Sequence, residues 1–280
     1  MRVTIMGATG LLGQALTREW SGDEITALGS RDVDIRLESQ VERIVREQKP
    51  DWIVLAAAYT DVDGCETNRE LAFDVNFRGA VRVAQAAAAT GSRLLFLSTD
   101  YVFDGRKATP YEIDDPLAPQ GVYGQSKAEA ELGIRDILPE CCILRTSWVF
   151  GVGGKCFPDT ILKLAATRPE IEVVDDQRGC PSYTVDLART IAALCNKGAT
   201  GTVHATNRGE CSWFDFATEI VREADLPTII RPTTSDKFVR PAKRPAYSVL
   251  SSVSLEEYGI EMPTWKDALE RYLRERNEVQ

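Results

Sequence analysis

A tyrosine and a lysine stand four residues apart in the segment YGQSK, as Tyr123 and Lys127. If the segment is helical, both side chains lie on one face, because residues i and i+4 are neighbours on a helix surface. A free tyrosine has a pKa of about 10, too high for ready proton exchange at neutral pH. A neighbouring ammonium is expected to lower that pKa. The pair could then give a proton to an oxygen that becomes negatively charged as hydride reaches its carbon.

Hydrogen-bonding side chains also follow the apolar run RLLFL, in the segment STDYVFDG. Thr99 and Asp100 stand at the predicted carboxyl end of a strand, which is the edge where doubly wound sheets bind ligands. The Thr99 hydroxyl could bind a substrate carbonyl oxygen beside Tyr123, and Asp100 could accept hydrogen bonds from substrate hydroxyls. A helix cap or turn at Thr99 is the simpler alternative, but it leaves the order of the motifs unexplained.

Three glycines, Gly7, Gly10 and Gly13, follow the first predicted strand and open the first predicted helix. Gly7 permits a tight turn, Gly10 lets the backbone approach a pyrophosphate, and Gly13 lets helix and strand pack closely. The free N–H groups of the helix N-terminus then favour bound phosphate. The spacing alone is a weak signal. Its strand–loop–helix context predicts a dinucleotide site rather than a glycine-rich packing turn.

The residues after the second predicted strand, LGSRDVDI, give a mixed signal on the choice of dinucleotide. An acidic side chain at this place usually binds the ribose diol of NAD, whereas arginine accommodates the extra phosphate of NADP. Arg31 favours NADPH as the cofactor, with NADH as the alternative, and Asp34 could reach the adenine side instead. An exposed surface charge is the plain alternative for Arg31.

Apolar runs of strand length alternate with longer segments of helical period. Strands without internal polar alternation, separated by helices, predict a parallel sheet covered on both faces. We therefore expect an α/β fold with a doubly wound parallel Rossmann sheet in residues 1–150. A smaller C-terminal substrate lobe is expected in residues 151–280, with the chain passing between the two. The predicted strands span residues 3–6, 25–28, 52–57, 93–98, 141–147 and 171–174. The predicted helices span residues 11–20, 37–48, 78–91, 123–137, 184–198, 212–224 and 265–277, and residues 150–160 are predicted as a loop.

Composition limits the partners and the compartment. The 280 residues carry a net charge of −9 without a Lys/Arg-rich run. Nucleic acids and anionic membranes bind clustered positive charge, so neither is expected as a partner. Seven cysteines without CxxC spacing and a single histidine favour buried thiols in a reducing compartment over disulfides or zinc. With neither a signal-like segment nor an apolar stretch of about 18 residues, we expect a cytoplasmic protein.

Longer strings in the chain are similar to those of a known family. In order, they are STDYVFDG, YGQSKAEAE, LRTSWVFG, DDQRGCPSYTVDLA, RPAYSVL and PTWKDAL. Together with the glycine loop, they resemble the dTDP-4-dehydrorhamnose reductases of the extended short-chain dehydrogenase/reductase family. The resemblance runs from residue 1 to about residue 275, nearly the whole chain.

The resemblance implies reduction of the 4-keto group of a dTDP-linked 6-deoxy sugar by NAD(P)H, which gives dTDP-L-rhamnose. It implies catalytic roles for Thr99, Tyr123 and Lys127, with Lys127 also contacting the nicotinamide ribose. The dTDP-sugar would contact the catalytic threonine together with Asp100, Trp148 and Arg244. The residues implied to contact the cofactor, besides Tyr123 and Lys127, are Gly7, Gly10, Leu11, Leu12, Gly13, Arg31, Asp34, Ala56, Ala57, Ala58 and Tyr59, with Asn76 supporting the active-site network.

Two positions depart from the family pattern. Leu55 stands where an asparagine is common near the cofactor, and Ala15 stands where some members hold Mg²⁺ at a dimer interface through a glutamate. We therefore expect no metal site, and the chain as a monomer or a homodimer. Two other functions stay open. The first is a reductase or epimerase of another nucleotide-linked keto sugar. The second is a non-catalytic regulatory subunit, against which the intact Tyr123 and Lys127 argue.

Overall fold

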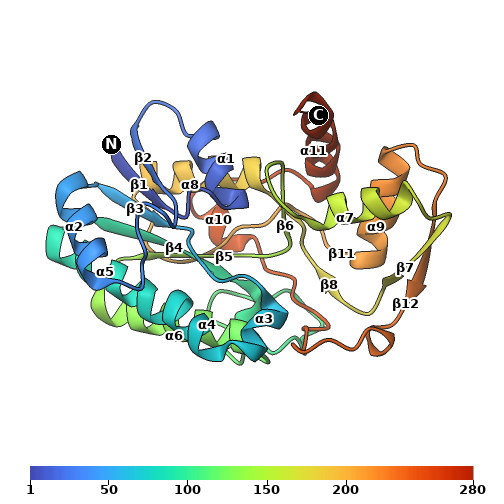
Figure 1. Ribbon diagram of the computed structural model, residues 1–280, viewed down its shortest axis with the longest axis horizontal. Coiled ribbons are helices and arrows are strands. Elements are labelled where there is room, and N and C mark those ends of the chain that lie inside the picture. Colours follow the sequence, from blue (N-terminus) through green and yellow to red (C-terminus); the bar gives the residue numbers. More distant parts are fainter. Residues whose placement is uncertain (280) are drawn as a thin grey trace.

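The computed structural model describes residues 1–279, with a six-stranded parallel sheet at its centre (Figure 1). The strands lie in the order β2-β1-β3-β4-β5-β10, and every neighbouring pair is parallel. Parallel neighbours need crossover connections, which helices supply in this fold. The strands are β1 (Arg2–Met6), β2 (Glu24–Leu28), β3 (Trp52–Leu55), β4 (Arg93–Thr99), β5 (Cys142–Thr146) and β10 (Gly201–His204).

Helices cover both faces of this sheet, which confirms the predicted doubly wound fold (Figure 1). On one face, α1 and α8 pack together over a core that includes Leu16, Val54 and Leu187. On the other face, α2, α5 and α6 enclose a core that includes Val45 and Phe96. The bounds of these helices are α1 (Leu11–Glu19), α8 (Thr184–Asn196), α2 (Glu38–Gln48), α5 (Ala80–Thr90) and α6 (Val122–Ile137).

The chain beyond residue 150 contributes to two bodies. α8, β10 and the short α10 (Val253–Glu256) return to the central sheet, where Val203 and Leu255 join the core beside α1. The other segments build a second lobe around Phe150, Phe216 and Tyr272, on the right in Figure 1. Its elements are α7 (Phe157–Ala165), α9 (Trp213–Glu223), α11 (Trp265–Val279), β7 (Glu170–Val174), β12 (Ile229–Thr233), β6 (Val149–Phe150), β9 (Ser182–Tyr183), β8 (Arg178–Gly179) and β11 (Cys211–Ser212).

Three segments differ from the sequence prediction. The strand predicted at 171–174 exists as β7, but it pairs with β12 in the second lobe and not with the central sheet. The sixth central strand is β10, whose sequence GTVH has one aliphatic residue and so does not stand out as an apolar run. The predicted loop at 150–160 ends early, because α7 begins at Phe157 with a proline in its first turn, where proline is well tolerated.

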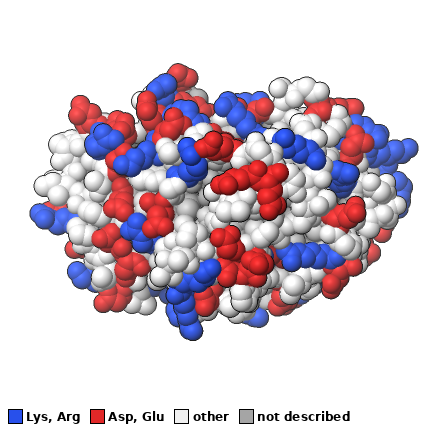
Figure 2. Space-filling model, turned by 180° about the vertical axis from the view of Figure 1, so that it is seen from behind, with Lys and Arg blue, Asp and Glu red and all other residues white. Residues whose placement is uncertain are grey.

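The molecular surface shows no single dominant charge on the face drawn in Figure 2, where basic and acidic side chains are interspersed. All seven cysteines are buried free thiols. Burial raises the pKa of the Cys141 thiol to about 11, so this group stays protonated at neutral pH. Within residues 1–279, no helix has the length and apolar character needed to cross a membrane.

Candidate active site

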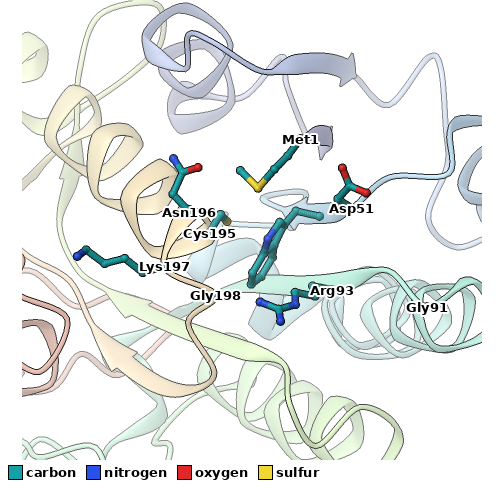
Figure 3. Close-up of a pocket in the computed structure, with 9 residues that line it drawn as sticks. Met1, Asp51, Gly91, Arg93, Cys195, Asn196, Lys197 and Gly198 are labelled. Carbon is teal, nitrogen blue, oxygen red and sulfur yellow. The ribbon is translucent and has the colours of Figure 1, made fainter.

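The carboxyl ends of the central strands carry almost all of the predicted site residues. The strand order reverses between β1 and β3, and ligands of doubly wound sheets bind in the crevice at such a switch point. A hollow of about 530 Å³ lies at the opposite end of the sheet, where Met1, Asp51 and Arg93 precede or begin strands (Figure 3). None of the predicted site residues lines this hollow.

Gly7 lies where the loops after β1 and β3 meet. Its φ is +97°, a backbone conformation that favours glycine. A Cβ at this position would lie 2.5 Å from the Ala57 nitrogen, so the two loops touch only because residue 7 has no side chain. Gly13 has a similar role in α1, since a Cβ there would lie 2.1 Å from the Gly7 carbonyl oxygen. The loop, the strand and the helix are packed as the dinucleotide fingerprint requires.

The N-terminus of α1 fits a phosphate group. Gly10 is its exposed N-cap, no side chain caps the helix, and its first turn contains no acidic residue. The first N–H groups of a helix lack partners within the helix and attract anions. Gly10, Leu11 and Leu12, which the family resemblance implies at the pyrophosphate, lie at this helix start, and their contact with a diphosphate stays a prediction.

Arg31 and Asp34, both beyond β2, lie in different environments. Arg31 is exposed and makes no ion pair with any residue that the structure describes. Asp34 accepts hydrogen bonds from the Arg36 side chain, at 2.9 Å from Nε and 2.6 Å from Nη2. The Arg36 guanidinium also lowers the pKa of this carboxyl. Arg31 is thus available to a phosphate, whereas Asp34 already has a cation, and its contact with adenine stays a prediction.

The residues Ala56 to Tyr59 follow β3 and are held by one buried amide. The Tyr59 N–H donates to Asn76 Oδ1 at 2.8 Å, and Asn76 Nδ2 donates to the Tyr59 carbonyl at 3.1 Å. The same Nδ2 donates to Ser126 Oγ at 3.0 Å, and that hydroxyl donates to the Tyr123 carbonyl at 2.8 Å. Asn76 therefore ties the predicted nicotinamide side of the crevice to the helix that carries Tyr123.

Tyr123 is the second residue of α6, and its side chain lies against the end of β4. Its ring contacts the Tyr101 ring edge-on, with centroids 5.8 Å apart. Burial raises the pKa of Tyr123, and a hydrogen bond with the Thr99 side chain offsets part of this rise. The expectation that Lys127 lowers this pKa is wrong for the free chain, because desolvation raises it and Lys127 is not among the groups that shift it. Tyr123 is therefore a neutral phenol with a proton to donate.

Lys127 is buried one turn further along α6, at 2% exposure. Its Nζ lies 3.9 Å from the centroid of the Phe96 ring. Burial lowers the pKa of Lys127 to about 7, and the Glu131 carboxylate only partly opposes this effect. The sequence predicted an ammonium here, whereas in the free chain burial brings the pKa of Lys127 close to neutral pH.

Thr99 and Asp100 end β4 and are both buried. Thr99 Oγ1 donates to Asp100 Oδ1 at 3.0 Å. Burial raises the pKa of Asp100 to about 6, and Ser248 and Thr99 offset part of the rise. Ser248 makes no well-formed hydrogen bond to Oδ2, which is buried without a partner among the described residues. An unpaired carboxylate oxygen beside Thr99 suits a hydroxyl of a bound ligand.

A buried ion pair lies behind this active-site edge. Glu131 is one turn beyond Lys127 on α6, and its Oε2 lies 2.7 Å from Nη2 of Arg145 on β5. The side chains are 0% and 2% exposed. Ser98 Oγ donates to Glu131 Oε1 at 2.5 Å, and Arg145 also donates to the Ile113 carbonyl at 3.1 Å. These contacts satisfy both charges, so the pair fixes α6 against β4 and β5.

A cavity of about 920 Å³ adjoins Tyr101 and extends along the second lobe. Arg244 lines it, and Trp213, Gln177 and Phe157 also belong to its wall. Trp148 is not among the lining residues. Its ring stacks on Trp213 with centroids 3.5 Å apart, so it supports the wall from behind. The volume is within the range of small-molecule sites.

Sequence reasoning missed Trp213 and Asp63. Trp213 is the first residue of α9 and lies between Ser212 and Asp215, which form a capping box. The helix predicted at residues 212–224 already located this helix start, and the S-x-x-D spacing in CSWFD is typical of it, but no local signal says that Trp213 faces a cavity. Asp63 pairs with Arg244, 181 positions along the chain. Within residues 1–279, no group of three or more His, Cys, Asp or Glu side chains is placed to hold a metal.

Comparison with known proteins agrees with this geometry. The family model described as RmlD substrate binding domain matches residues 1–278. The chain is 42% identical to dTDP-4-dehydrorhamnose reductase of Mycobacterium tuberculosis, over 96% of this chain and 91% of that protein. It is 41% identical to the spore coat polysaccharide biosynthesis protein SpsK of Bacillus subtilis, over 99% of this chain and 98% of that protein.

Solved structures point the same way. The crystal structure of dTDP-4-dehydrorhamnose reductase from Bacillus anthracis in complex with NADP has a TM-score of 0.96 to this chain. It shares 38% sequence identity and covers 98% of this chain and 99% of that one. The match of the family model is also nearly complete. The chain therefore belongs to the RmlD substrate binding domain family, which confirms the resemblance to the dTDP-4-dehydrorhamnose reductases.

Proposed function

We propose that this chain reduces the 4-keto group of dTDP-4-dehydro-6-deoxy-L-mannose to give dTDP-L-rhamnose, with NADPH or NADH as the reductant. The nicotinamide cofactor supplies hydride to the carbonyl carbon. Tyr123 supplies the proton to the carbonyl oxygen, and Thr99 holds that oxygen by a hydrogen bond. One hydride and one proton convert the ketone to a secondary alcohol, so the atoms and electrons balance.

The placement of the Tyr123 phenol against Thr99, one helical turn from Lys127, is the observation that carries this proposal. A proton donor in a buried site costs little until it has given its proton, when the phenolate needs a nearby cation. Lys127 can become that cation if bound phosphate and ribose favour its charged form. Asp100 would accept a hydrogen bond from a sugar hydroxyl through its unpaired oxygen.

We also propose that the cavity beside Tyr101 holds the dTDP part of the substrate, in a lobe drawn mainly from residues 151–280. Arg244 would bind the diphosphate, since a guanidinium can bond two oxygens at once. Trp148 would act on the substrate through Trp213, on which it stacks. Seven free thiols support a location in the cytoplasm, where cysteines stay reduced.

A coupled assay tests the proposed function directly. The purified chain is supplied with the dTDP-linked 4-keto-6-deoxy-L-sugar and either NADPH or NADH. We expect loss of the reduced nicotinamide absorbance and dTDP-L-rhamnose as the product identified by NMR. Turnover restricted to another nucleotide-linked keto sugar would favour the alternative reductase or epimerase. A chain that binds NADPH but turns over no keto sugar would favour the regulatory subunit.

Arg31→Ala is expected to discriminate between the two cofactors. Arg31 is exposed and makes no ion pair within residues 1–279, so its loss removes a cation available to the 2′-phosphate of NADPH, which NADH lacks. We expect the KM for NADPH to rise about tenfold and the KM for NADH to change less than about twofold. Initial rates with each cofactor measure both values, and equal effects on the two would exclude Arg31 from a phosphate site.

Cofactor binding is expected to take up a proton at pH 8. Lys127 has a pKa of about 7 in the free chain and is then mostly neutral, whereas nearby phosphate charge and ribose hydroxyls favour its ammonium. Titration calorimetry in buffers of different ionisation enthalpy should give an uptake of about half a proton or more. Lys127→Met should abolish this uptake. An uptake that persists in the variant would assign the proton to another group.

A further inference from the structure

One segment, which we call the strap (residues 235–246), runs along the wall of the cavity and concentrates positive charge there. It contains four cations and one acid, in a chain whose net charge is −9. Arg240, Lys243 and Arg244 line the cavity together with the apolar Phe238 and Val239. Asp104, Glu172 and Asp236 also line the cavity, so its positive charge is concentrated in residues 240–244, where a ligand with negative charges next to an apolar part would fit.

Asp63 holds this strap through three different groups. Arg244 Nη1 donates to Asp63 Oδ1 at 2.8 Å, and Nη2 donates to Oδ2 at 2.9 Å. The Ala242 N–H donates to Oδ1 at 3.1 Å, and Arg240 Nη1 approaches Oδ2 at 3.4 Å. These contacts lower the pKa of Asp63 to about 2, and the hydrogen bond from Arg244 has the largest effect. The carboxylate is therefore ionised throughout the neutral range.

The pairing uses only part of the Arg244 guanidinium. Arg244 Nη1 donates both of its hydrogens, one to Asp63 and one to the Ala242 carbonyl at 2.7 Å. Nη2 donates one hydrogen to Asp63. Of the five N–H donors of an arginine, the Nε–H and the second Nη2–H have no acceptor within residues 1–279. These two donors are parallel and form one edge of the fork, which matches two oxygens of a phosphate.

Asp63 is itself fixed from the cofactor side. It lies in α3 (Val62–Thr67), which begins three residues after Tyr59, the last residue of the segment from Ala56 to Tyr59. Asp61 caps α3 by accepting a hydrogen bond from the Gly64 N–H at 2.9 Å. A Cβ on Gly64 would lie 2.5 Å from the Tyr59 hydroxyl, so α3 and this segment are in close contact. Asp63 thus joins the cofactor crevice to the wall of the substrate cavity.

We propose that Asp63 is a positioning residue, which holds Arg244 by one edge so that its other edge binds the diphosphate of the substrate. This inference rests on the proposed function, since it assumes a nucleoside diphosphate in the cavity. Asp63 itself makes no contact with the substrate, because its carboxylate would repel the substrate's phosphates. Asp63 acts only by fixing the direction of a cation whose long side chain otherwise has many rotamers.

Calorimetric titration with dTDP and with thymidine tests this role without turnover. In Asp63→Asn, we expect the Kd for dTDP to rise about tenfold or more, because the bidentate charge-assisted contact is lost. The Kd for thymidine, which has no phosphate, should stay within about twofold, as should that for NADPH. Asp63→Glu keeps the charge but displaces the carboxylate, and a smaller rise for dTDP is expected. Asp267→Asn, which removes an exposed carboxylate paired with Arg271, is the matched control.

The outcomes separate the inference from the function on which it rests. An unchanged or tighter binding of dTDP by Asp63→Asn would overturn the positioning role, since it would mean that Asp63 is neutral or competes with phosphate. Equal weakening for dTDP and thymidine would show a general loss of structure and would also overturn it. If the Asn variant fails to fold, the Kd values of the Glu variant for dTDP and thymidine are judged in the same way. A wild-type chain that binds no dTDP and reduces no dTDP-sugar would instead reject the proposed function itself.

Discussion

Tyr123→Phe is expected to lower kcat by about 10²–10⁴-fold, the range that a single general acid contributes. The substitution deletes only the phenolic O–H and keeps the ring, which packs edge-on against Tyr101. Because the oxygen is removed from the reacting end and not from the glycine loop, the Kd for NADPH should change less than about twofold. Steady-state rates and a fluorescence titration of NADPH measure the two quantities.

The matched control is Tyr258→Phe, which removes a phenolic O–H that donates to the Thr200 carbonyl on the surface, away from the site. This variant should retain its turnover. If Tyr123→Phe kept most of its turnover, another group would have to supply the proton, and the assignment of the acid would be wrong. Because Asp100 also lies in the site with a pKa raised to about 6, the pH profile of the residual activity would indicate whether it substitutes.

Glu131→Ala is expected to lower the free energy of unfolding by about 3–5 kcal/mol. The carboxylate is 0% exposed and pairs with an arginine that is 2% exposed, so its removal leaves a buried charge without a partner. It also removes the acceptor of the Ser98 hydroxyl, on the strand that ends in Thr99. Urea denaturation followed by circular dichroism gives the difference at constant m-value.

Two controls bracket this effect. Glu47→Gln removes one partner of an exposed pair with Arg43 and should cost less than about 1 kcal/mol. The double variant Glu131→Leu with Arg145→Met replaces both charges by apolar groups and should recover about half or more of the loss. A single Glu131 variant as stable as the wild type would mean that Arg145 finds water or another partner.

The local parts of the fold and site could be predicted from the sequence, because their signals are local. Apolar runs and helical periods located the first five central strands, and the glycine spacing located the turn after β1. The pairing of β7 and the identity of β10 depend on partners far along the chain, which no window reveals. The same holds for Asp63, whose partner is 181 positions away.

The electrostatics of the site are a clearer case of this limit. The spacing of Tyr123 and Lys127 correctly placed both on α6, but it suggested that one group would acidify the other. Desolvation depends on what the whole fold packs around a group, and here it raises the pKa of the phenol and lowers that of the amine. Residue type and spacing therefore identified the pair, while burial decided its protonation.

The late arrival of β10 has a consequence for biosynthesis. Residues 201–204 supply the sixth strand, and α8 packs beside α1 on one face of the sheet. The apolar core around Leu144 is therefore exposed to solvent until these segments have been synthesised. A ribosome must therefore release more than two thirds of the chain before the nucleotide-binding half can close. Until then β5 is the edge strand of the sheet in the nascent polypeptide, and its side toward β10 is unpaired and apolar. Chaperones shield surfaces of this kind.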